Sequence, residues 1–80
     1  MKLYVGNLPY AVTEARLRGL FEEFGPATSV TVVTDKATGK SKGFAFVEMS
    51  DPDAQKAIAA LNKSSLDGRT IFVDAARVRS

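Results

Sequence analysis

The heptapeptide Gly43-Phe44-Ala45-Phe46-Val47-Glu48-Met49 alternates between two kinds of side chain. Phe44 and Phe46 are aromatic, whereas the residues that follow each of them are small or aliphatic. Alternation with a period of two is typical of a β-strand, in which successive side chains point to opposite faces of the sheet. One face of a strand at 43–49 is therefore suited to a core, and the other face carries aromatic rings.

Similar alternation predicts three more strands, at residues 2–6, 28–34 and 70–76. A polar segment with a central glycine, residues 35–42, joins the second strand to the third and predicts a long hairpin loop. A turn-rich segment precedes the last strand.

Apolar residues at helical spacing predict two helices. The first follows Thr13, a good N-cap residue, and ends at Gly25-Pro26. The second begins at Ser50 or Asp51, with a proline in its first turn, and runs to about Leu61. The resulting order is β-α-β-β-α-β.

This order predicts an α+β protein with the ferredoxin-like, or split βαβ, topology. Two right-handed crossovers place the first and third strands in the middle of a four-stranded antiparallel sheet and both helices on one face. Eighty residues fit one domain. We expect residues 1–80 to form that domain, with a core over 2–76 and a short tail at 77–80.

Strand alternation divides the sheet residues into two sets. The set facing the helices is aliphatic: Leu3, Val5, Val30, Val32, Ala45, Val47, Met49, Ile71 and Val73. The outward set contains four aromatic residues: Lys2, Tyr4, Gly6, Thr31, Val33, Phe44, Phe46, Glu48, Phe72 and Asp74. An uncovered aromatic patch beside charged residues indicates a binding surface, because soluble proteins rarely expose large apolar patches. Rings next to Lys and Arg suit single-stranded nucleic acid, whose bases stack and whose backbone is anionic.

Composition narrows the range of functions. The chain has no cysteine and no histidine, which excludes disulfides and thiolate or imidazole metal sites and removes the commonest catalytic nucleophile and base. We expect no enzymatic activity, cofactor, metal or small-molecule substrate. The net charge of +2 favours anionic partners only mildly. No apolar stretch is long enough for a membrane span or a signal peptide, so we expect a cytoplasmic location, or a nuclear one in a eukaryote.

Two segments resemble the signatures of the RNA recognition motif family. Residues 42–49 match seven of the eight positions of the ribonucleoprotein motif K/R-G-F/Y-G/A-F-V-x-F/Y, departing only at Met49, which faces inward by alternation. Leu3-Tyr4-Val5-Gly6-Asn7-Leu8 is similar to the family's second signature in the first strand. The resemblance covers residues 3–76 and extends to the small single-domain RNA-binding proteins of bacteria, especially cyanobacteria.

The resemblance implies single-stranded RNA binding and a role for each site residue. Tyr4 and Phe44 would each stack one base, Phe46 would lie against the sugars, and Lys42 would pair with a phosphate. The segment 74–77 would read base edges. The remaining predicted RNA-binding residues are Lys2, Lys40, Asp74, Arg77 and Arg79.

Several alternatives stay open. The same stacking surface would bind single-stranded DNA, and some domains of the family bind peptides instead, typically through the helical side or after losing the central aromatic residues. A ferredoxin-like enzyme such as an acyl phosphatase would need an arginine in the first loop, Asn7 to Val12, which has none. Tyr10 could contact RNA or pack as a cap, and Phe72 could bind or pack. We expect a monomer.

Overall fold

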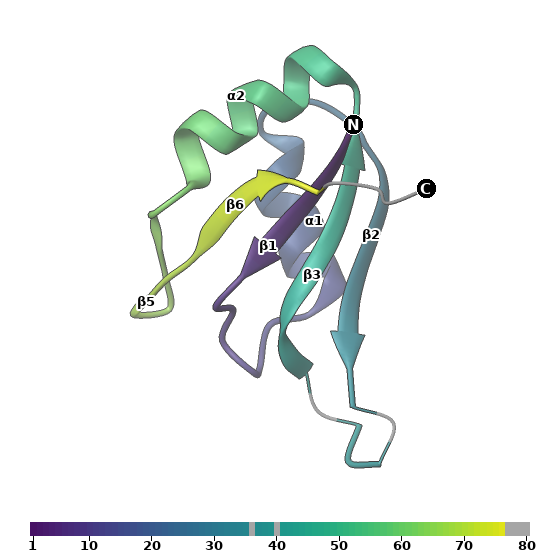
Figure 1. Cartoon of the computed structure of the whole chain (residues 1–80), viewed down its shortest axis with the longest axis vertical. Helices are drawn as coiled ribbons and strands as arrows, with labels where there is room; N and C mark the ends of the chain where they lie inside the picture. The colour runs from purple at the N-terminus through teal and green to yellow at the C-terminus, as the bar shows by residue number, and fades with distance from the viewer. Residues whose placement is uncertain (36, 40, 77–80) are drawn as a thin grey trace.

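The computed structural model describes residues 1–35, 37–39 and 41–76, and of residues 41 and 42 it describes only the backbone. A four-stranded antiparallel sheet has the order β2-β3-β1-β6 (Figure 1), and β4 pairs with β5 in a small second sheet. The elements in chain order are β1 (Lys2–Gly6), α1 (Glu14–Glu22), β2 (Ala27–Thr34), β3 (Ser41–Met49), α2 (Asp51–Leu61), β4 (Ser65–Leu66), β5 (Arg69–Thr70) and β6 (Phe72–Ala75). The first and third strands are central, which confirms the predicted ferredoxin-like topology.

The core lies between the helices and the aliphatic face of the sheet. Helix α1 lies behind β1 and β3 in Figure 1, and α2 contacts β3 and β6. Both layers supply the largest fully buried side chains, which are Phe21, Leu3, Leu8, Leu17, Ile71, Val5, Val47 and Val73. Met49 is only 2% exposed, so the one departure from the ribonucleoprotein motif is a core residue, as alternation predicts. Val32 is the exception in the inward set, because it lies on edge strand β2 and is only partly buried.

The helices begin where the sequence predicts, although their caps differ. The hydroxyl of Thr13 accepts a hydrogen bond from the backbone N–H of Arg16 at 3.2 Å. Ser50 occupies the N-cap of α2, but its hydroxyl donates to the Asp53 carboxylate at 2.9 Å and makes no bond to the backbone. The helices contain nine and eleven residues. Within the described ranges, no helix is both long and apolar enough to cross a membrane.

The segment before the last strand differs from the prediction of turns at 62–68 followed by one strand at 70–76. It forms the β4–β5 hairpin, closed by Asp67 and Gly68 with φ values of +50° and +82°. Positive φ at both central residues defines a type I′ turn, for which Asp-Gly is a favoured pair. Ile71 follows this hairpin, belongs to no strand and is fully buried. The last strand, β6, therefore begins at Phe72 rather than at residue 70.

Candidate nucleic-acid interface

The face of the sheet opposite the helices forms a regular grid of outward side chains. Across β3, β1 and β6, the register places Phe44, Gly6 and Phe72 in one row. The next row is Phe46, Tyr4 and Asp74, and the third pairs Glu48 with Lys2. The sequence offered five aromatic residues as predicted or possible RNA contacts: Tyr4, Tyr10, Phe44, Phe46 and Phe72. All of them except Tyr10 occupy two adjacent rows of this grid. We call this surface the open face.

Three rings on the open face form a compact triangle. The centroid of Tyr4 lies 5.9 Å from that of Phe44 and 5.9 Å from that of Phe46, and the two phenylalanine centroids are 6.0 Å apart. The rings of Tyr4 and Phe44 are inclined by only 25°, whereas Phe46 stands nearly perpendicular to Phe44 at 85°. Tyr4 is 39% exposed, and the phenylalanines are half-buried. Mutual edge and offset contacts hold the rings in place, because these are the favourable geometries of aromatic pairs.

Gly6 lets the Tyr4 ring lie down on the strand. A Cβ atom at Gly6 would lie 2.7 Å from Tyr4 Cε2 and 2.9 Å from its hydroxyl oxygen, closer than van der Waals contact allows. Gly6 is buried because the ring covers it. Sequence reasoning placed Gly6 on this face but did not identify it as the seat of the ring, since only the side-chain direction of Tyr4 reveals that contact.

Charged groups flank the rings. Lys2 Nζ lies 4.9 Å from the centroid of the Phe46 ring, a cation–π contact that leaves the ammonium group exposed. The Asp74 carboxylate is also exposed, and one of its oxygens accepts the backbone N–H of Ala75 at 2.8 Å. Together with Glu48, the described open face carries two carboxylates and one ammonium group. The described part of this face therefore carries more negative than positive charge.

The structure describes only part of the predicted site. It brings together Tyr4, Phe44, Phe46, Lys2 and Asp74 on the open face. The backbone of Lys42 belongs to β3, and its side chain lies outside the description. Lys40, Arg77 and Arg79 lie outside the described residues.

Sequence reasoning missed a second group at the end of β1. Asn7 accepts a hydrogen bond from Arg69 Nη2 at 2.7 Å and donates one from its amide to the carbonyl of Thr70 at 2.6 Å. The Arg69 guanidinium carbon lies 5.8 Å from the centroid of the Tyr10 ring, which is 66% exposed. Tyr10 therefore does not pack as a cap. Arg69 carried no local sequence signal, because its position depends on the β4–β5 hairpin.

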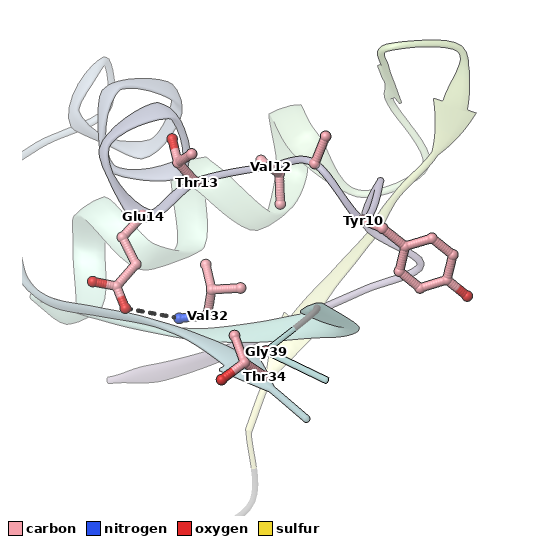
Figure 2. Close-up of a pocket in the computed structure, with 8 residues that line it drawn as sticks. Tyr10, Val12, Thr13, Glu14, Val32, Thr34 and Gly39 are labelled. Carbon is pink, nitrogen blue, oxygen red and sulfur yellow. Dashed lines mark hydrogen bonds between the residues drawn. The ribbon is translucent and has the colours of Figure 1, made fainter. Parts of the chain in front are cut away.

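A pocket of about 420 Å³ lies on the helix side, between the start of α1 and strand β2 (Figure 2). Val12, Thr13 and Val32 contribute to its lining, and the carboxylate of Glu14 accepts the backbone N–H of Val32 at 3.4 Å. The pocket is separate from the three rings of the open face, because Val32 belongs to the inward set. Among the described residues that line it, Glu14 is the charged one, and it is acidic.

Comparisons with known proteins agree with this geometry. The sequence matches the RNA recognition motif over residues 3–71. It is 50% identical over 80 residues to the 31 kDa chloroplastic ribonucleoprotein of Nicotiana sylvestris, which covers 99% of this chain and 25% of that protein. It is 48% identical to the 28 kDa chloroplastic ribonucleoprotein of Spinacia oleracea, over 98% of this chain and 34% of that protein. The chain thus spans between a quarter and about a third of these relatives.

Solved structures show the same fold. The crystal structure of RNA binding protein PG1 superposes with a TM-score of 0.93 and 46% identity, over 100% of this chain and 98% of that one. An Sxl-lethal protein/RNA complex gives a TM-score of 0.93 at 34% identity, over 99% of this chain and 48% of that one.

The relatives correct the expected location. The expected cytoplasmic or nuclear location is contradicted by the curated relatives, which are chloroplastic ribonucleoproteins. The expectation rested on the lack of an apolar leader. Chloroplast transit peptides are amphipathic and rich in Arg and Ser, so that criterion has no bearing on this organelle.

Proposed function

The chain belongs to the RNA recognition motif family, and on that premise we propose that it binds single-stranded RNA on the open face of its sheet. One observation carries the proposal: the centroids of three aromatic rings lie within 6.0 Å of one another on a face that neither helix covers. A ring exposed in this way offers a π-face to an unstacked base, and such stacking contributes ~1–3 kcal/mol per base.

We assign the roles of the site residues by their positions. Tyr4 and Phe44 each stack one base, and their small interplanar angle of 25° lets two successive bases lie nearly parallel. Phe46 stands on edge to Phe44 and lies against the sugars. Asp74 accepts hydrogen bonds from base edges beside Tyr4, its neighbour in the register.

Phosphate contacts belong to the basic residues of this site. The exposed position of Lys2 beside the Phe46 ring supports one such contact. The other members of the proposed phosphate-binding set are Lys40, Lys42, Arg77 and Arg79. A set of this kind is needed because the described open face itself carries more carboxylates than cations.

Residues 1–80 act, in this proposal, as one monomeric RNA recognition motif with a core over 2–76 and a tail at 77–80. The activity is binding, and no catalytic step is assigned to any residue. Single-stranded DNA is the first alternative ligand, because stacking and phosphate contacts do not distinguish it; contacts to the 2′-hydroxyl would. A peptide-binding role is less well supported, because all three central rings are present on the open face.

The experiment is a titration with RNA and DNA oligonucleotides of one sequence. The wild type is compared with Phe44→Ala, which removes the stacking ring, and with Phe44→Leu, which keeps apolar bulk but has no π-face. We expect both variants to weaken binding by about five- to 150-fold, following the stacking range of ~1–3 kcal/mol. Wild-type affinity for Phe44→Leu would show that base stacking is not the mechanism, and tighter binding of DNA than of RNA would favour the alternative ligand.

A further inference from the structure

An exposed aromatic ring and a guanidinium group meet at one end of the sheet, outside the open face. Tyr10 belongs to the loop between β1 and α1, and its ring is 66% exposed. Tyr10 is one of the residues that line the pocket, and Figure 2 shows its side chain directed away from Val12 and Glu14. Arg69 comes from β5 and places its guanidinium carbon 5.8 Å from the ring centroid.

The guanidinium group is held by neutral partners. Arg69 donates to the side-chain carbonyl of Asn7 at 2.7 Å, and the amide of Asn7 is fixed in turn by the Thr70 carbonyl at 2.6 Å. Asn7 has a φ of +59°, a left-handed conformation that asparagine tolerates better than most residues. Of the ion pairs within residues 1–35, 37–39 and 41–76, none includes Arg69. The arrangement therefore orients a positive charge without neutralising it.

The pair lies directly beyond one row of the open face. Asn7 follows Gly6, which is paired with Phe44 on one side and Phe72 on the other. Tyr10 approaches the residue before Phe44: a Cβ atom at Gly43 would lie 3.8 Å from Tyr10 Cε1. A nucleic acid strand that leaves the Phe44 row at this end of the sheet meets the ring and the guanidinium group next.

We propose that Tyr10 and Arg69 form a further nucleotide subsite, which takes one more nucleotide of the RNA strand bound on the open face. The base stacks on the Tyr10 ring, and the phosphate accepts hydrogen bonds from the guanidinium donors that Asn7 leaves unused. Arg suits this role because its donors form a planar fork that matches phosphate geometry. The proposal rests on the proposed RNA binding and extends it from the sheet to the adjoining loop and hairpin.

The test is a length series of one RNA sequence, from three to seven nucleotides, titrated against matched variants. Tyr10→Ala removes the ring, Tyr10→Phe keeps it, and Arg69→Gln removes the charge. Lys56→Gln removes an exposed charge from α2 and is the control. Phe46→Ala reports on the open face itself.

We expect Tyr10→Ala to weaken binding of the longest RNA about five- to tenfold, the lower part of the stacking range, and to leave the shortest unchanged. Tyr10→Phe and Lys56→Gln should bind every length like the wild type. Arg69→Gln should reduce the log–log salt slope by ~0.7 with the longest RNA only, the share of one phosphate on a single strand. This length dependence separates a subsite from a merely structural contact, which would lower the melting temperature and affect all lengths alike.

The outcomes distinguish this subsite from the proposed function. If Phe46→Ala weakens every length while Tyr10→Ala binds the longest RNA like the wild type, the subsite is refuted and RNA binding on the sheet stands. Equal losses at all lengths in Tyr10→Ala also refute it. If the wild type binds none of the RNAs, both proposals fail.

Discussion

Replacing Gly6 by alanine should weaken RNA binding by displacing the Tyr4 ring. The new Cβ atom would lie 2.7 Å from Tyr4 Cε2, and ordinary contact begins at 3.4 Å, so the ring edge must move by about 0.7 Å. That displacement lifts the ring from β1 and disturbs its near-parallel arrangement with Phe44. We expect loss of part of one stacking interaction, ~1 kcal/mol or about a fivefold rise in Kd.

Protein stability should change little in the same variant. Glycine in a strand is destabilising by ~0.5–1 kcal/mol relative to alanine, and this gain offsets the cost of moving an exposed ring. Gly19→Ala is the matched control, because a Cβ atom at that exposed position in α1 meets nothing within 4 Å. It should stabilise the protein by up to ~1 kcal/mol and leave RNA affinity unchanged.

The assay is a double-mutant cycle measured by fluorescence anisotropy. Gly6→Ala is introduced into the wild type and into Tyr4→Ala, with folding checked by thermal unfolding. If the alanine acts through the ring, it costs affinity in the first background and nothing in the second. An equal loss in both backgrounds, or no loss in the wild type, would refute the idea that Gly6 serves as the seat of the ring.

Three further outcomes follow from the same structure. Phe44→Ala should weaken RNA binding by ~1–3 kcal/mol without unfolding the protein, because the ring is half-exposed on the open face; an isothermal titration and a melting curve check both parts. Lys42→Gln should lower affinity for all RNA sequences equally and flatten the log–log salt slope by ~0.7, and a changed sequence preference would contradict its phosphate role. Thr13→Ala should lower the free energy of unfolding by ~1 kcal/mol through loss of the hydrogen bond to the Arg16 N–H, measured by urea denaturation, with RNA affinity unaffected.

The alternation of side chains along the strands was enough to predict most of the fold and the aromatic residues at the centre of the candidate site. It separated Ala45 and Val47 from Phe44 and Phe46 correctly, because in a sheet covered on one face each residue's parity fixes its side. The β4–β5 hairpin was not predicted, although Asp67-Gly68 is a residue pair typical of a type I′ hairpin turn. Two-residue strands are too short to show a period. The predicted start of the last strand at residue 70 was therefore wrong, because β6 begins at Phe72.

The missed parts of the site depend on side-chain directions and on contacts between distant segments. Gly6 matters because the Tyr4 ring lies over it, and no local pattern states where a ring lies. Arg69 reaches Asn7 across 62 positions in the chain, and only the completed fold brings them together. Sequence patterns thus locate residues on a face, whereas contacts of this kind need the three-dimensional structure.

The charged residues of the described open face bear on how RNA affinity should depend on salt. In the described middle, Glu48 and Asp74 outnumber Lys2, so electrostatic attraction there contributes little to holding an anionic strand. Stacking is short-ranged and insensitive to salt, whereas phosphate contacts weaken as counterions compete. RNA affinity should then divide into a salt-independent part from the rings and a salt-dependent part from cations at the margins, such as Arg69. On the proposed binding mode, carboxylates beside the rings also repel a phosphate there, which would favour the bases rather than the backbone over Tyr4 and Phe44.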